Sequence, residues 1–79
     1  MMKTIFTAAR IQRLRRDFSS SRRVAEIAGV DPLRLLRFDG GEKKRRLNSD
    51  ELERVAGVLG VPVESIADSK GYPVMAEIA

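Results

Sequence analysis

The sequence predicts an all-α fold in which about five short helices pack into one compact bundle. Apolar residues recur at spacings of three and four, which is the period of an amphipathic helix. Glycine and proline divide the chain cleanly into short segments. The length of 79 residues suits one domain with a single, modest core.

The first expected helix spans residues 4–17. Four apolar residues at helical spacing form its inner face: Ala8, Ile11, Leu14 and Phe18. The arginines of this segment lie largely on its other faces. The serines at 19–21 end this helix and offer an N-cap for a second helix, residues 22–28, which stops at Gly29.

A third helix is expected over residues 32–39. Asp31 is a favoured N-cap, and Pro32 suits the first helical position because its missing N–H would be unpaired there anyway. Leu35 and Phe38, three residues apart, turn toward the core. Since only Gly29 and Val30 separate the second helix from this cap, the two helices must meet at a sharp angle. The sequence thus predicts a central helix-turn-helix.

A fourth helix follows, for which residues 48–51 offer several overlapping N-caps. Among them, Asn48 and Glu51 have approximately the spacing of a capping box. The inner face of this helix consists of Leu52, Val55, Ala56 and Leu59, and it stops at Gly60. A short fifth helix follows Pro62 and covers residues 63–67. Residues 1–68 then form the helical domain. The tail, residues 69–79, pairs as a strand with a second copy, folds back on its own core or is disordered.

Charge is distributed unevenly along the chain. Residues 1–46 contain 13 Lys or Arg and 5 Asp or Glu, whereas residues 47–79 contain 2 and 6. A basic half beside a mildly acidic half favours a polyanionic partner, although charge runs also occur simply as solvated surface. Arg22 and Arg23 pose a question of their own. They precede a helix, whose amino terminus repels cations.

The predicted second to fifth helices resemble a known family in sequence. "VAEIAGVDPLRLLRFDGG" followed by "LERVAGVLGVPVESIA" is similar to the lambda-repressor/Cro-type helix-turn-helix, also called the xenobiotic-response-element family. The resemblance covers residues 21–67. The matching positions are Val24-Ala25, Ala28-Gly29-Val30, Leu35, Arg37-Phe38-Asp39, Gly41, Val55-Ala56 and Leu59-Gly60-Val61.

Three departures from the family pattern stand out. Ser21 occupies a position that is usually glutamine, and Pro32 follows Asp31 where serine or threonine usually begins the next helix. The link after Gly41, "EKKRRLNS", is long, strongly basic and lacks the common proline.

The resemblance implies that the third helix lies in the major groove of double-stranded DNA. With Leu35 and Phe38 inward, the residues facing the groove are Pro32, Leu33, Leu36 and Arg37, with Arg34 at the flank. Arg34 and Arg37 are candidates for guanine, and the two leucines for thymine methyl groups. Asp31 could accept from a cytosine amino group, but the role of N-cap is favoured because its charge would repel phosphates. The expected contacts to the DNA backbone are Ser21, Arg22, Arg23, Lys43, Lys44, Arg45 and Arg46.

The sequence therefore favours a small transcriptional regulator, of phage or plasmid repressor type, that acts in the cytoplasm as a homodimer on an inverted repeat. The alternatives are an antitoxin or a protein-interaction adaptor that uses the leucine-rich third helix. The chain has no cysteine or histidine and no phosphate-cradling glycine loop, so an enzyme is not expected. No cofactor, metal, membrane partner or small-molecule substrate is expected either.

Overall fold

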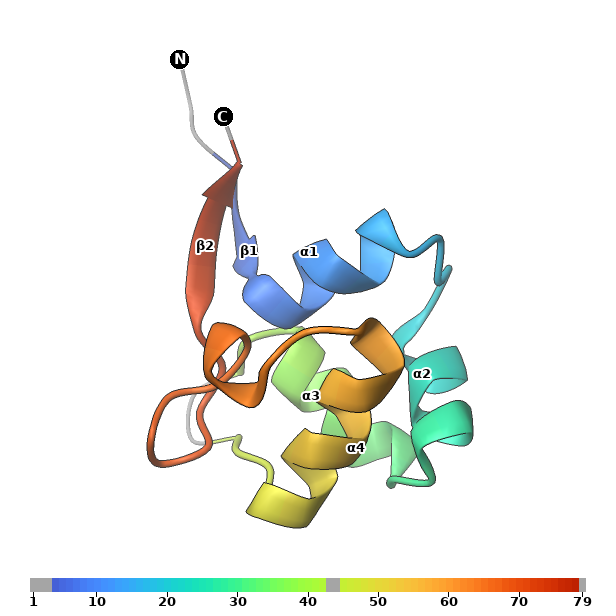
Figure 1. Ribbon diagram of the computed structural model, residues 1–79. Coiled ribbons are helices and arrows are strands. Elements are labelled where there is room, and N and C mark those ends of the chain that lie inside the picture. The colour runs from blue at the N-terminus through green and yellow to red at the C-terminus, as the bar shows by residue number, and fades with distance from the viewer. Residues whose placement is uncertain (1–3, 43–44, 79) are drawn as a thin grey trace.

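The computed structural model describes residues 4–42 and 45–78 of the chain (Figure 1). These residues form a mostly helical bundle with a small sheet of two strands. The helices are α1 (Ala8–Arg15), α2 (Ser21–Ala28), α3 (Pro32–Asp39) and α4 (Ser49–Leu59). One turn of 3₁₀-helix, η1 (Val63–Ser65), follows α4, and the strands are β1 (Thr4–Thr7) and β2 (Met75–Ile78). The radius of gyration is 11.4 Å, close to the roughly 12 Å of a compact chain of this length.

The predicted bounds of α3 and the predicted end of α2 at Ala28 are confirmed, while α2 begins one residue earlier than predicted, at Ser21. The Ser20 hydroxyl accepts from the Arg23 amide before α2, and the Asp31 carboxylate accepts from two amides at the start of α3. Asn48 and Glu51 form the predicted capping box of α4. Gly29 and Gly60 end α2 and α4 with φ of +73° and +71°, a conformation that glycine adopts at little cost.

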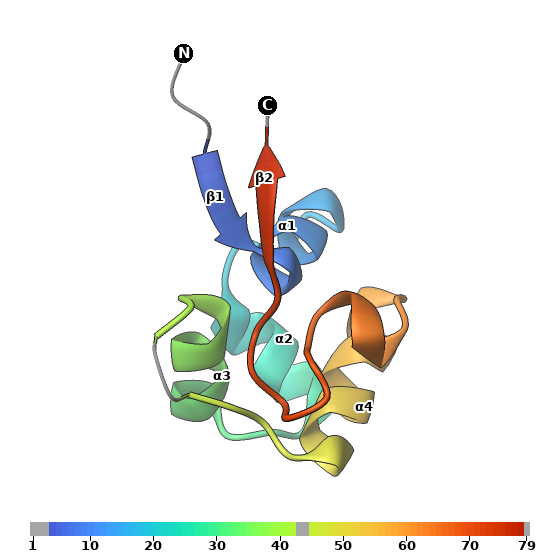
Figure 2. The same ribbon diagram turned by 90° about the vertical axis from the view of Figure 1, so that its left-hand side faces the viewer.

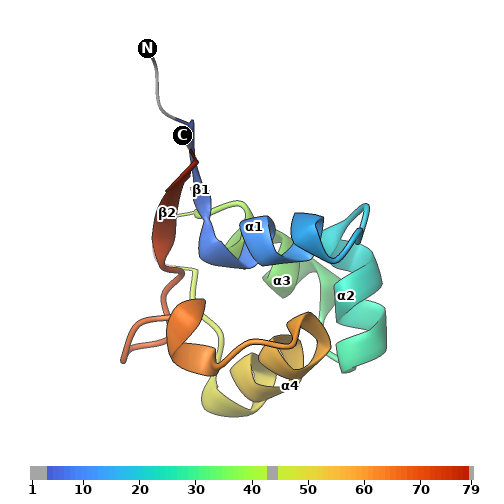
Figure 3. The same ribbon diagram turned by 45° about the horizontal axis from the view of Figure 1, so that its top comes forward.

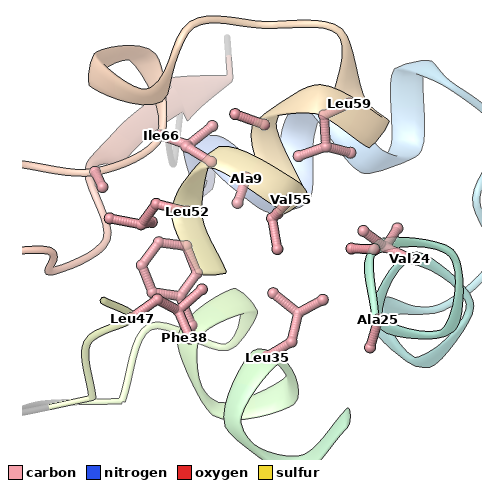
Figure 4. Packing of buried hydrophobic residues seen from close by; sticks show 13 residues of the cluster. Ala9, Val24, Ala25, Leu35, Phe38, Leu47, Leu52, Val55, Leu59 and Ile66 are labelled. Atoms are coloured by element: carbon pink, nitrogen blue, oxygen red, sulfur yellow. The ribbon is translucent and has the colours of Figure 1, made fainter. Parts of the chain in front are cut away.

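The core lies where α2, α3 and α4 meet, with α1 and the segment after η1 closing it (Figure 4). Leu35 and Phe38 of α3 are 2% and 0% exposed, which confirms the predicted inward face of that helix. The four apolar residues predicted for the inner face of α4 are likewise buried. The remaining buried residues of the cluster are Ala9, Val24, Ala25, Ala28, Leu47, Ile66 and Ala67.

The prediction of a helix from residue 4 was wrong at its start. Residues 4–7 form β1, which pairs antiparallel with β2 in the register Thr4↔Ile78 to Thr7↔Met75. The two strands project as a ribbon from the helical body (Figure 3). The helix begins at Ala8 because the Thr7 hydroxyl caps it by accepting from the Arg10 amide at 3.1 Å.

The predicted inner face of α1 was also partly wrong. Ile11 is buried, but Leu14 is 48% exposed and Arg13 is 9% exposed. The helix turns Arg13 inward because this arginine forms an ion pair with the buried Asp39 of α3.

The end of the chain differs from the predicted fifth helix. Only residues 63–65 are helical, as one 3₁₀ turn, and Ala67 then pairs with Pro73 in an isolated bridge. The tail forms a strand, but its partner is β1 of the same chain, a pairing that was not among its expected courses. The small sheet makes the fold mostly, rather than entirely, helical.

A cluster of three charged residues joins α1 to the carboxyl end of α3. The Arg13 guanidinium donates from Nε and Nη2 to the two carboxylate oxygens of Asp39, at 3.0 and 3.3 Å. Arg10 Nε donates to the same carboxylate at 3.0 Å. The Asp39 side chain is only 4% exposed and that of Arg13 11%. A third Arg13 donor reaches the Phe18 carbonyl at 3.0 Å, which also secures the link to α2.

This cluster leads to a stability prediction. We expect Asp39→Asn to lower the free energy of unfolding by about 3 kcal/mol, because the change leaves two arginines without a buried counter-charge. Urea unfolding followed by circular dichroism would measure the loss.

The matched control is Asp50→Asn, which removes the same charge from an exposed pair with Arg54, 3.0 Å apart. We expect that change to cost less than about 1 kcal/mol. Equal losses in the two variants would contradict the role given to Asp39.

Candidate nucleic-acid interface

The outer face of α3 carries the side chains that the sequence placed there. Leu33 and Leu36 are each 53% exposed, and Pro32 is exposed as well. Arg37 is partly exposed, with its Nε 3.7 Å from a carboxylate oxygen of Glu42. Because the opposite face of α3 is fixed in the core by Leu35 and Phe38, the outer face is held in one orientation.

The amino terminus of α2 presents two arginines to solvent. The side chains of Arg22 and Arg23 are 80% and 62% exposed, and each lies near a Glu26 oxygen, at 3.6 and 3.4 Å. Exposed pairs at this spacing are weak. Both guanidinium groups can therefore turn to another anion at little cost.

Ser21 does not belong to this surface. It is the first residue of α2 and only 4% exposed, so its side chain faces the interior rather than solvent. We therefore remove Ser21 from the candidate contacts to the DNA backbone.

The segment between α3 and α4 supplies further cations. Arg45 and Arg46 are exposed, and Leu47 anchors the segment through a side chain that is 2% exposed. Lys43 and Lys44, which were also predicted contacts, lie outside the described residues.

Lys70 joins this basic segment although it lies far away in the sequence. Residues 68–72 form a tight turn in which an Asp68 carboxylate oxygen accepts from the amides of Lys70 and Tyr72. The turn lies against residues 45–48, where the Leu47 amide donates to the Gly71 carbonyl at 3.1 Å (Figure 2). Gly71 has a φ of +90°, and a Cβ there would meet the Leu47 carbonyl oxygen. This close contact leaves Lys70 exposed beside the basic segment.

An open groove of about 1010 Å³ brings these groups together. Its lining comes from α3, from the segment after α3 and from the turn at residues 68–71. Leucines and cations share the lining, among them Leu33, Arg34, Arg37, Arg45, Arg46 and Lys70. Four acidic residues line the same groove: Asp31 before α3, Glu53 on α4, Glu64 in η1 and Asp68 in the turn that carries Lys70.

Arg34 is held by a partner that the sequence analysis did not identify. Its Nε and Nη2 donate to the two carboxylate oxygens of Glu51 on α4, at 2.9 and 2.8 Å. The same carboxylate accepts from the Asn48 amide at 3.0 Å as part of the capping box. The hydrogen bonds and charge of Arg34 lower the pKa of Glu51 below its usual 4.5, against the opposing effect of partial burial. The pKa of Arg34 is raised in turn, chiefly by its hydrogen bonds to Glu51.

No family model, curated protein or solved structure matches this chain in comparisons with known proteins. In the part of the chain that the structure describes, none of the helices combines the length and the apolar character needed to cross a membrane.

The Arg34–Glu51 pair predicts how stability depends on pH. Because the pKa of Glu51 is lowered in the folded state, its carboxylate stabilises the fold above the ordinary value of 4.5. That contribution is lost as the pH falls below this value, through the folded-state pKa. We expect Glu51→Gln to be less stable than the natural chain at neutral pH, with a difference that shrinks as the pH falls below 4.5 and through the folded-state pKa.

Urea unfolding of the natural chain and of Glu51→Gln across this pH range would measure the difference in the free energy of unfolding. A gap that stays constant, or that widens in acid, would contradict the ion pair.

Proposed function

We propose that this chain is a sequence-specific regulator of transcription that binds double-stranded DNA. In this proposal α2, the link at Gly29 and Val30, and α3 form a helix-turn-helix of the lambda-repressor/Cro type, and α3 enters the major groove. The local hydrogen bonds support this assignment, since the amides of Gly29 and Val30 both donate to the Ala25 carbonyl and make the link tight.

The observation that carries the proposal is the placement of cations around α3. Arg22 and Arg23 come from α2, Arg45 and Arg46 from the segment after α3, and Lys70 from a turn near the end of the chain. Arg45, Arg46 and Lys70 line one groove with α3, whereas Arg22 and Arg23 are exposed at the start of α2, which packs against α3. The opposite face of α3 is anchored in the core. Such an arrangement suits a duplex, whose two phosphate backbones border the groove that a helix enters.

The proposal explains why Arg22 and Arg23 lie at the amino terminus of a helix. A cation at a helix amino terminus is unfavourable in the free chain, and the first turn of α2 contains no acidic residue. A DNA phosphate bound there accepts hydrogen bonds from the free backbone amides and pairs with both arginines. The unfavourable charge then becomes part of the binding site.

Different residues of α3 would contact different bases. Arg37 and Arg34 offer the forked donors that suit guanine, and Leu33 and Leu36 offer apolar contact to thymine methyl groups. Asp31 is occupied as the N-cap, accepting at 2.8 Å from the Leu33 amide, so we assign it no base.

One copy of a domain this small offers few base contacts. We therefore propose that two copies bind an inverted repeat with half-sites about 34 Å apart, one turn of the double helix. Because β2 is paired with β1 within the chain, a contact between copies would have to use an outer edge or a face of this ribbon, or another surface.

A second candidate function rests on the apolar character of α3. With Leu33 and Leu36 half exposed, the helix could instead dock onto another protein, as an adaptor or as the antitoxin of a toxin. The two proposals differ in their dependence on salt. Contacts to phosphates weaken steeply as salt rises, whereas contacts between apolar side chains hardly change.

The proposed function predicts a steep salt dependence and a specific sensitivity to charge. Six or more phosphate contacts should lower the affinity for duplex DNA by about a thousandfold between 50 and 200 mM salt. Reversing the charge of Arg45 and Arg46 to Glu should weaken binding further and flatten the salt slope. Fluorescence anisotropy with a labelled duplex would measure both effects.

The matched control reverses Arg15 and Arg16, two exposed arginines at the end of α1 that lie outside the proposed interface, and should have a much smaller effect. The most informative first step is to select bound sequences from random duplexes at two salt concentrations. An enriched inverted repeat would support the proposal, and the absence of binding even in dilute buffer would contradict it.

A further inference from the structure

Arg34 and Glu51 form the closest ion pair on the groove side of α3. Two hydrogen bonds of 2.9 and 2.8 Å join the side of the guanidinium to both oxygens of one carboxylate. Both partners are placed by their helices. Arg34 is the third residue of α3, and Glu51 is the third residue of α4, where it also closes the capping box. The Glu51 side chain is only 14% exposed, so neighbouring groups restrict its movement.

The geometry of the pair leaves the reading edge of Arg34 unoccupied by Glu51. A guanidinium carries five N–H donors in one plane, and Glu51 accepts from two of them, on Nε and Nη2. The remaining donors include the parallel pair on Nη1 and Nη2, an edge that suits bidentate contact with guanine O6 and N7. The Arg34 side chain stays 52% exposed and lines the groove beside Leu33 and Arg37.

We infer that Glu51 is a positioning residue for base recognition, which holds the Arg34 fork so that its free edge reads a guanine. The inference rests on the proposed function and names a further determinant of specificity within it. An arginine side chain loses much rotational freedom when it binds, and the cost of ordering it reduces the affinity gained. Glu51 orders Arg34 before DNA arrives. It also occupies the Nε side of the fork, which leaves the edge formed by Nη1 and Nη2 free.

Removing the carboxylate of Glu51 should have two different effects on DNA binding, one on overall affinity and one on base discrimination. A carboxylate near DNA repels phosphates, so removing it should strengthen binding to every sequence alike. If Glu51 positions Arg34, removing the carboxylate should in addition weaken discrimination at one base pair. The two effects are separable because one is uniform across sequences and the other is confined to one position.

The test uses Glu51→Gln, Arg34→Ala and the double variant in the full chain. A glutamine at this position can still serve a capping box, but it offers one acceptor oxygen instead of two. Affinities would be measured by competition on the selected duplex and on duplexes that change one base pair at a time. We expect Arg34→Ala to abolish a guanine preference at one position. Glu51→Gln should reduce that preference by about tenfold and leave the other positions unchanged.

The double variant separates positioning from a direct effect. In the Arg34→Ala background, Glu51→Gln should produce no further change in base preference, because Glu51 acts through Arg34. The matched control is Asp50→Asn, which removes an equal charge from the preceding residue of α4 and should leave the preference intact. Thermal melting would verify that each variant is folded.

The following results would overturn the inference about Glu51. A full guanine preference in Glu51→Gln, or the same loss with and without Arg34, contradicts the positioning role. If the natural chain shows base preferences that neither Glu51→Gln nor Arg34→Ala alters, only this role fails and the proposed function stands. If the natural chain distinguishes no bases at all, the proposed function fails and takes this inference with it.

Discussion

The rest of the structure depends on the buried carboxylate of Asp39. It ends α3, where the helix dipole disfavours a negative charge, and it is nearly inaccessible to water. Arg13 and Arg10 compensate for both disadvantages by donating from α1. The Thr7 hydroxyl adds a 2.7 Å hydrogen bond to the Asp39 carbonyl, and Arg10 also lies over the Phe6 ring. Asp39 thus joins α3 to α1 through its carboxylate and to the ribbon through its carbonyl, and these contacts fix the carboxyl end of α3.

The two ends of α3 are held by different chemistry, and this difference determines what its surface can do. Charge pairing buries the carboxyl end, whereas at the amino end the pair between Arg34 and Glu51 remains half open to solvent. Between them, Leu35 and Phe38 hold the helix in the core. A helix secured at both ends and along one face can present its opposite face without reorganising, and such preorganisation favours tight binding.

Local signals in the sequence predicted much of the fold, while long-range pairing escaped prediction. The Asp31-Pro32 start of α3, the capping box of α4 and the stops at Gly29 and Gly60 all depend on residues within four positions of one another. The β1 strand depends on a partner at the opposite end of the chain, and Arg13 is buried by a residue 26 positions away. The same limit applies to the candidate site. Helical periodicity placed the residues of α3 on its outer face, but neither the burial of Ser21, nor the approach of Lys70, nor the Arg34–Glu51 pair left a signal in the neighbouring sequence.

The most direct test of the central claim is a titration of the isotope-labelled chain with a selected duplex, followed by backbone amide NMR signals. If α3 enters DNA between the flanking cations, the largest shifts will fall on the first turns of α2 and α3, on residues 45–48 and on the turn around Lys70. Signals from the ribbon formed by β1 and β2 should change little. Shifts confined to that ribbon, or spectra that duplex DNA leaves unchanged in dilute buffer, would contradict the account.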